Sequence, residues 1–184
     1  RPMFIGRTSP TRWVYISVPV IISDFMMEKD TAGITDRMRR LCSRREYCSS
    51  DILKKVSDAL NGDRDAAGRV LETLVSERYV DDLRYATAYA RDKATISGWG
   101  ATKIRYMLSG KGIEKDVIAK ALEEIDGGKA EVRLEKLLEN KLRSLKDDPQ
   151  VRLKLLRFAL GRGYQYDQVK SVVDSLWEKS KENG

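Results

Sequence analysis

A glycine-rich segment with several cations is the first candidate for chemistry in this sequence. The segment SGWGATKIRYMLSGKGI runs from Ser97 to Ile113 and places Lys103, Arg105 and Lys111 among pairs of glycines. Glycine-rich loops beside lysines often hold phosphates, but a P-loop requires the pattern GxxxxGK[ST] directly after a strand. The spacing in GWGATK differs from that pattern, and the third glycine of a dinucleotide fingerprint is missing. We therefore expect these glycines to bracket a short helix and expect no nucleotide or other cofactor.

The cations of this expected helix form a candidate binding surface. Gly100 is placed to cap the helix, and Ile104 and Leu108 fall on one face of it. Lys103 and Arg105 flank that face on opposite sides, and such a cationic, aromatic surface suits an acidic protein groove or phosphates. The alternative is that the cations are only solvated and that the tryptophan fills a gap between helices. The candidate partner-binding residues of this region are Arg91, Lys93, Trp99, Lys103, Arg105 and Lys111.

An arginine stripe nearer the N-terminus is a second candidate surface. The run RMRRLCSRREY places Arg37, Arg40 and Arg44 on one side of a helix, at spacings of three and four. Arg40 and Arg44 are the candidate contacts for phosphates or for a protein partner. The alternative is a solvated helix face whose charges pair with Glu46 and Asp51.

Residue types argue against catalysis and against a metal site. The chain contains no histidine, which removes the commonest general base and the commonest transition-metal ligand. Cys42 and Cys48 are the only cysteines, too few for a zinc site and without a CxxC spacing. Neighbouring carboxylates lie at expected helix ends, where capping is their ordinary role. We expect no catalytic residue, no metal and no enzymatic activity.

Composition and the N-terminal segment suggest a cytoplasmic protein. Its 35 Lys and Arg against 28 Asp and Glu give a net charge of +7, which favours anionic partners. The apolar run Trp13–Ile22 is interrupted by Pro19 and is too short to span a bilayer. No small-residue cleavage site follows it. We expect residues 1–30 to be a non-globular or misassigned leader, with the true start at Met26 or Met27.

From about residue 34 the apolar residues recur at helical spacing, without strand alternation. Runs of ten to sixteen residues end at glycines, polar clusters or proline, and they form three groups of three helices. The sequence thus predicts an all-α fold: three tandem helix-turn-helix-like repeats, at residues 31–80, 81–128 and 129–184, in an elongated, curved solenoid. The polar, glycine-bearing stretch 126–130 is an expected hinge.

A shift of 51 residues aligns the second and third helices of these groups without a gap. It aligns Leu53, Ile104 and Leu155 in the second helices. In the third helices it aligns an acidic residue of the first turn, namely Asp65, Asp116 and Asp167. We expect equivalent residues to occupy equivalent places in the core.

Two stretches carry a family resemblance. SRREYCSSDILKKV (Ser43–Val56) is typical of the opening of a RecX first repeat. LVSERYVDDLRYATAYARDKATISGWGATKIRYMLSGKGI (Leu74–Ile113) contains a Y-[ILV]-D-D-x-R-[FY]-A junction, a W-G segment and an I-R-x-x-L-x-x-K-G-I helix. The sequence therefore resembles the RecX family, regulators of the bacterial RecA recombinase, over residues 31 to about 178. The leader before Met26 departs from the family pattern.

The resemblance implies a non-enzymatic, all-α regulator of DNA repair and recombination in the SOS response. Such a protein docks in the groove of the RecA filament on DNA and restrains the ATPase and strand exchange of RecA. We expect a monomer that contacts this filament, with single- or double-stranded DNA as a further partner and no membrane. The resemblance does not assign contact residues. The alternative is a direct DNA-binding protein that uses its helix-turn-helix-like units.

Overall fold

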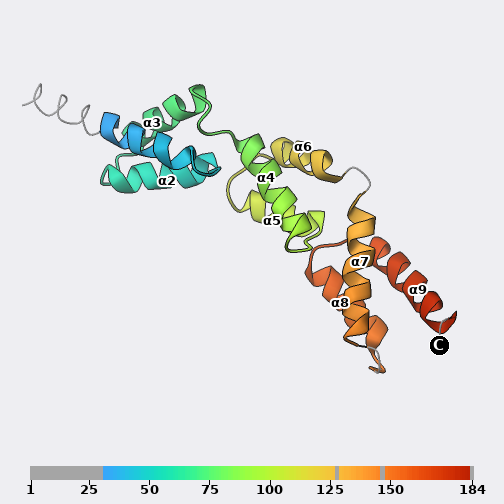
Figure 1. The fold of residues 1–184 in the computed structure, drawn as a ribbon. Helices are drawn as coiled ribbons and strands as arrows, with labels where there is room; N and C mark the ends of the chain where they lie inside the picture. Colours follow the sequence, from blue (N-terminus) through green and yellow to red (C-terminus); the bar gives the residue numbers. More distant parts are fainter. Residues whose placement is uncertain (1–30, 127–128, 146–147, 183–184) are drawn as a thin grey trace, which may run out of the picture.

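The computed structural model describes residues 31–126, 129–145 and 148–182. Within these ranges the chain is helical and contains no strand, and its helices follow one another in three groups along an elongated, bent path (Figure 1). The predicted all-α repeat architecture is confirmed. The expected leader, residues 1–30, and positions 127–128 of the expected hinge lie outside the described residues.

The first helix group combines helical residues 31–42 with α2 (Ser49–Ala59) and α3 (Arg64–Ser76). An ion pair ties the first of these helices to the end of α3, where Arg39 Nε donates to Glu77 Oε2 at 2.7 Å. The three helices enclose one apolar core of small and medium side chains: Met38, Cys42, Tyr47, Ile52, Val56, Ala67, Val70, Leu74 and Val80.

The second helix group consists of α4 (Asp82–Thr95), α5 (Ala101–Ser109) and α6 (Lys115–Asp126). Asp81 caps α4 by accepting the backbone N–H of Arg84 at 3.0 Å. Helix α4 packs mainly against α6 and also contacts α5. Its buried face consists of small residues, which allow close helix packing: Ala86, Thr87, Ala90 and Ala94.

The third helix group consists of α7 (Lys129–Arg143), α8 (Val151–Gly161) and α9 (Tyr166–Glu182). Each of these helices packs against the other two. Leucine and valine side chains dominate the shared core, which contains Leu134, Leu138, Val151, Leu155, Ala159, Tyr164, Val169, Val172, Val173 and Leu176.

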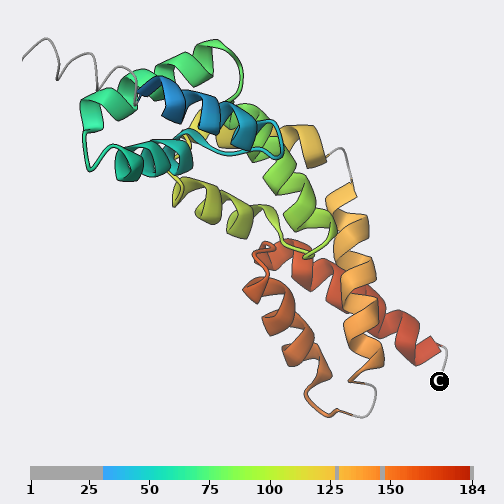
Figure 2. The same cartoon turned by 60° about the vertical axis from the view of Figure 1, so that its left-hand side comes forward.

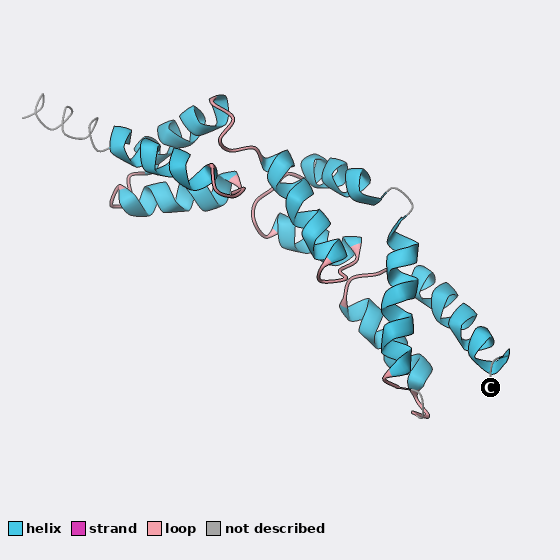
Figure 3. Cartoon of the chain, in the orientation of Figure 1, coloured by secondary structure: helices cyan, strands magenta, loops and turns pink. Residues whose placement is uncertain are grey.

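The second helices of the three groups lie along one side of the molecule. Figure 2 shows α2, α5 and α8 following one another on this side, with α3, α6 and α9 on the other, as in Figure 1. Short loops and turns join the helices within the first two groups and join α8 to α9 (Figure 3). No helix in the described part of the chain is long and apolar enough to cross a membrane.

The 51-residue alignment is wrong in one place, at α2. Ile52 is fully buried and takes the place of Ile104, whereas Leu53 is 38% exposed. The stretch from buried Val56 of α2 to buried Ala67 of α3 is one residue longer than its counterparts, Leu108–Ile118 and Ala159–Val169. It contains two residues of positive φ, Asn61 and Gly62. The third helices keep the predicted spacing, because the fully buried residues Ala67, Ile118 and Val169 are each 51 positions apart.

Candidate partner-binding surface

Helix α5 lies as the sequence predicts. It begins at Ala101 with Gly100 as N-cap, and it buries Ile104 and Leu108. Tyr106 points away from the core with 76% of its surface exposed. The positive φ of Gly112, 75°, ends the following turn as expected. The cations of this helix therefore lie beside the buried face.

Two lysines and a tryptophan form a cluster at the start of α5, here called the lysine–tryptophan cluster. Lys103 Nζ lies 4.6 Å from the ring centroid of Trp99, and Lys93 Nζ lies 5.1 Å from it. The half-buried indole also packs against the core of the second helix group. Trp99 thus fills a gap between helices while it holds two cations by cation–π attraction.

Arg105 lies apart from that cluster. Its side chain is exposed and lines a hollow of about 300 Å³ together with Arg133 of α7 and Tyr164. Arg133 and Arg162 oppose a rise in the pKa of Tyr164, but burial is the larger effect, and the pKa of this phenol lies above its usual value. Lys103 is not among the residues that line this hollow, so the two cations flanking α5 do not share one site.

Gly100, the N-cap of α5, allows two backbone segments to come into contact. Gly100 N–H donates to the carbonyl of Arg162 at 2.8 Å, and Thr102 N–H donates to that of Gly163 at 3.2 Å. A Cβ on Gly100 would lie 2.4 Å from Gly163 O. Gly163 has φ +86°, and a Cβ there would lie 2.4 Å from Cβ of Lys103. This contact links the second helix group to the third, and we call it the second joint. It lies in the segment that resembled a phosphate loop.

Arg162 strengthens the second joint, and sequence reasoning missed it. Its Nη1 donates to Ser97 O, and its guanidinium lies 4.6 Å from the ring centroid of Phe158. Lys103 Nζ reaches Gly161 O at 3.4 Å across the same joint. The sequence did contain a signal for the role of Arg162. The GRG run containing Arg162 lies 51 residues after the GKG run containing Lys111.

Lys111 belongs to a first joint, between the first and second helix groups. Its Nζ lies 2.7 Å from Asp51 Oδ2, and its carbonyl accepts the Ser50 hydroxyl at 2.5 Å. Asp82 Oδ1 accepts the backbone N–H of Ser49 at 2.7 Å. The hydrogen bond with Asp51 raises the pKa of Lys111. Lys111 thus makes its contacts within the chain, across the first joint.

Charge also shapes the surroundings of this first joint. Burial favours a higher pKa for Asp51, but hydrogen bonds from Lys111 and Cys48 outweigh it, and the pKa lies below its usual value. Arg84 Nε donates to Glu46 Oε1 at 2.7 Å, while Glu46 Oε2 is buried without a hydrogen-bond partner among the described residues. A buried, unpaired carboxylate oxygen is costly. The first joint is therefore polar and incompletely satisfied.

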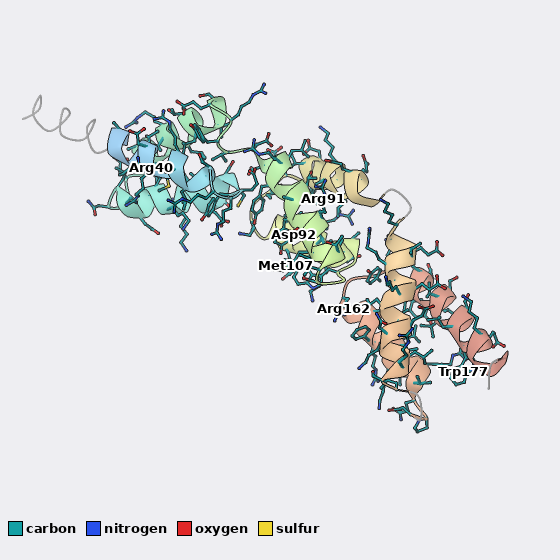
Figure 4. All side chains as sticks on the ribbon, viewed as in Figure 1. Arg40, Arg91, Asp92, Met107, Arg162 and Trp177 are labelled. Atoms are coloured by element: carbon teal, nitrogen blue, oxygen red, sulfur yellow. The ribbon has the colours of Figure 1, made fainter. Side chains whose placement is uncertain are left out.

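Arg91 lies on another side of α4 from the lysine–tryptophan cluster. Its Nη2 is 3.9 Å from Glu124 Oε1 of α6, and Glu124 Oε2 accepts the Thr87 hydroxyl at 3.0 Å. Figure 4 shows Arg91 beside α6, with Met107 at the opposite edge of the group. The structure thus brings Lys93, Trp99 and Lys103 together and leaves Arg91 outside.

Arg40 and Arg44 form a separate cationic patch in the first helix group, where Figure 4 labels Arg40. With Arg37 and Lys55 they line a hollow of about 440 Å³ between residues 31–42 and α2. Met38 and Leu41 supply its apolar part, and Asp58 is its acidic residue. The predicted arginine stripe exists as one surface, but it does not join the α5 surface.

The charged groups that line these hollows are mainly cations. Among residues 31–126, 129–145 and 148–182, no three Cys, Asp or Glu side chains gather to hold a metal ion. Both described cysteines are free and buried, and burial raises the pKa of the Cys42 thiol. Cations, one indole and backbone groups remain, and these groups recognise acidic or phosphorylated surfaces.

Two family models match the chain. The second three-helix domain of RecX matches residues 81–122, and the third three-helix domain matches residues 131–173. Both matches fall on helix groups described above, and the second joint lies between them.

Curated relatives agree with these models. The chain is 37% identical over 127 residues to the regulatory protein RecX of Clostridium botulinum (strain Eklund 17B / Type B), covering 65% of this chain and 59% of the relative. It is 29% identical over 155 residues to the regulatory protein RecX of Chromohalobacter salexigens, covering 84% of this chain and all of the relative. The chain spans about six-tenths of the length of the clostridial relative.

Solved structures share the fold. RecX from Lactobacillus salivarius superposes with a TM-score of 0.73 at 20% identity, over 81% of this chain and 97% of that structure. A structure of a regulatory protein RecX superposes with a TM-score of 0.75 at 21% identity, over 93% of this chain and 81% of that structure. The domain models, the curated relatives and the fold agree with the sequence resemblance, and the chain belongs to the RecX family.

Proposed function

We propose that this chain regulates the RecA recombinase by binding the RecA–DNA filament and inhibiting its ATPase and strand exchange. Curated relatives carry the name regulatory protein RecX, which supports a regulatory role. In this proposal the chain acts as a cytoplasmic monomer, without a cofactor and without chemistry of its own. It thereby restrains recombination and DNA repair.

The observation that carries the proposal is the second joint, which ties two helix groups together beneath the lysine–tryptophan cluster. Backbone hydrogen bonds from Gly100 and Thr102 fix the third helix group against the start of α5. The cations at positions 93 and 103 are thus held at a fixed place between two groups. A preorganised cationic surface loses less conformational entropy when an acidic partner binds.

The shape of the chain suits a long partner. Helices α2, α5 and α8 follow one another along one side of the molecule (Figure 2). Each carries exposed cations, namely Lys54, Lys55, Arg105, Arg152, Lys154 and Arg157. Arg152 and Lys154 also pair with carboxylates of the chain. Cations on three successive helices of an extended molecule suit an extended, negatively charged partner such as a protein filament on DNA.

The DNA-dependent ATPase of RecA tests the proposal. RecA, DNA and ATP are held constant while the folded chain is added up to and beyond equimolar amounts. We expect ATP hydrolysis to fall as the chain is added. An unchanged ATPase rate at equimolar chain, with folding confirmed by circular dichroism, would contradict the proposal.

A charge-reversal variant tests the surface. We expect Lys103→Glu combined with Arg105→Glu to remain folded, because both side chains are at least partly exposed and a lost cation–π pair costs about 0.5 to 1 kcal/mol. The variant should lose inhibition of the ATPase. Lys115→Glu combined with Lys120→Glu is the matched control, since both are exposed cations on α6 of the same group and the change of charge is the same. Equal inhibition by the double variant and the control would exclude the α5 surface.

A second candidate function is direct DNA binding. The observation in its favour is the cationic hollow lined by Arg37, Arg40, Arg44 and Lys55. Phosphate contacts release counterions, so affinity for DNA alone would fall steeply as salt rises. Fluorescence anisotropy of labelled DNA, measured from low to physiological salt, separates the two candidates. Strong, salt-sensitive DNA binding with an unaffected RecA ATPase would favour the second.

A further inference from the structure

A groove lies between the α4–α5 loop and helix α7, and neither function above uses it. It has a volume of about 570 Å³. One stripe of α7 at spacings of three and four forms one wall, and residues 94–99 form the other. The residues of α7 that line this loop groove are Arg133, Lys136, Leu137 and Asn140, and Arg162 joins them from the turn after α8.

All the charged residues that line the loop groove are cations. Arg133, Lys136 and Arg162 line it, and no carboxylate lies among its described lining residues. The acidic residues of α7 face elsewhere, as Glu135 pairs with Lys179 of α9 at 3.0 Å. Helix α7 thus presents Arg133 and Lys136 to the groove and Glu135 to α9. An uncompensated cationic groove attracts carboxylates.

The loop groove also has a fixed apolar side. Ile96 is 81% exposed at its rim, the highest exposure among the large hydrophobic residues of the described chain. Gly98, with φ +62°, packs its backbone directly on α7, because a Cβ there would lie 3.1 Å from Leu137 Cδ1. Arg162 holds the same loop by donating to Ser97 O. The groove is therefore preformed and presents an aliphatic side chain beside its cations.

We propose that the loop groove binds an acidic peptide segment that carries an aliphatic side chain. Carboxylates of the segment would pair with Lys136 and Arg133, and its aliphatic side chain would cover Ile96. A nucleic-acid strand fits less well, since bases need free aromatic faces and Trp99, the aromatic residue here, already holds Lys93 and Lys103. The inference rests on the proposed function only in assigning the segment to a protein of the RecA filament.

An NMR titration tests the groove directly. A short peptide of glutamates and leucines is added to the ¹⁵N-labelled chain, beside a matched peptide with glutamine in place of glutamate. We expect amide shifts concentrated at residues 95–98 and 133–140 with the acidic peptide and weak shifts with the neutral one. Equal shifts from both peptides, or shifts centred elsewhere, would overturn the proposal.

Variants of the groove sharpen this test. Lys136→Glu should weaken binding of the acidic peptide about tenfold, because reversing one charge pair changes the free energy by about 1.4 kcal/mol. Ile96→Ser should weaken it about threefold without affecting folding, because the side chain is exposed. Arg143→Glu is the control, an exposed cation of α7 outside the groove with the same change of charge. A loss with Arg143→Glu equal to that with Lys136→Glu would contradict the proposal.

Two further results separate this inference from its rivals. Stronger groove shifts from a DNA oligonucleotide of equal charge than from the acidic peptide would overturn it in favour of nucleic acid. Peptide binding is measured without RecA, so its failure and the failure of the ATPase experiment are independent. Inhibition of RecA without peptide binding would overturn only the loop groove.

Discussion

The two joints between helix groups occupy equivalent positions and yet are built differently. In each, the turn after the second helix of one group meets the start of the second helix of the group before it. The carbonyl of Lys111 accepts from Ser50 in the first joint, and the carbonyl of Arg162 accepts from Gly100 in the second. Gly112 and Gly163 give both turns a positive φ. The turns of the two joints are thus equivalent and lie 51 residues apart, but the groups that donate to them differ.

The two joints differ in the residue that caps the N-terminus of the second helix. Gly100 has no side chain, so two backbones touch, and amides at the start of α5 donate hydrogen bonds to carbonyls of the turn after α8. Cys48 caps α2 and buries its thiol completely in the core of the second helix group. In that joint a Cβ on Gly112 would lie 3.9 Å from Ser50 Cβ, an ordinary contact. Charged side chains bridge the wider gap, and we infer that the first joint is adjustable and the second rigid.

Adding a methyl group at Gly100 should have the largest effect. Gly100→Ala places a Cβ 2.4 Å from Gly163 O, so the backbones must separate and lose hydrogen bonds. We expect unfolding free energy to fall by about 2 to 3 kcal/mol. Urea denaturation measures this loss, and hydrogen exchange of the Thr102 amide locates it.

Gly161→Ala is the matched control for that variant. Gly161 ends α8 in the same turn, and a Cβ there meets no atom within 4 Å. Alanine also favours helix over glycine, so stability should stay equal or rise slightly. Equal losses in the two alanine variants would show that glycine is not required for contact at the second joint.

Removing the lysine of the first joint should have a smaller effect. Lys111→Ala deletes the ion pair with Asp51, whose side chains are 31% and 37% exposed. Partial exposure limits the expected loss of unfolding free energy to about 1 kcal/mol. Exchange of the Ser49 amide should accelerate while that of Thr102 stays unchanged. Acceleration at both amides would indicate that the joints open together.

Salt should distinguish the joints without any mutation. Exposed charge pairs are screened when the Debye length falls to about 3 Å at 1 M salt, whereas contacts between backbones are not. We expect 1 M sodium chloride to reduce protection of the Ser49 amide by a fewfold and to leave the Gly100 amide unaffected. Native-state hydrogen exchange by NMR reads both amides in one sample. Equal sensitivity would remove the distinction drawn between the joints.

Lowering the pH should destabilise the first joint, and this is the smallest of the expected effects. The pKa of Asp51 lies below its usual value, so its contribution is complete above the unfolded pKa of about 3.9. That contribution is lost as the pH falls through the lower pKa of the folded state. Protection of the Ser49 amide should therefore stay constant from pH 7 to about 4 and fall below it. Asp51→Asn should remove this step, and a step that persists would assign it to another carboxylate.

Much of the fold followed from periodicity in the sequence. Buried Ile104 and Leu108 lie at helical spacing, and the third helices keep their repeat. The position of Leu53 did not follow, because the chain from Val56 to Ala67 is one residue longer than its counterparts, so that α2 and α3 need different shifts. An alignment without gaps cannot reveal one extra residue between two helices, because each helix still looks amphipathic by itself.

The candidate site was less predictable than the helices. Lys93, Trp99 and Lys103 meet as a helical wheel and a short loop allow. The engagement of Lys111 and the role of Arg162 depend on which group each turn meets, and this information lies in tertiary contacts. The two glycine runs that carry them are a sequence signal for the joints, which a search for phosphate loops overlooks.

The RecA ATPase in the presence of the two alanine variants tests the central claim most directly. The claim is that the rigid second joint presents the surface that regulates RecA. Wild type and Gly161→Ala should inhibit the DNA-dependent ATPase equally, and Gly100→Ala, folded under the assay conditions, should inhibit it markedly less. Equal inhibition by Gly100→Ala and wild type, or no inhibition by wild type, would contradict the claim.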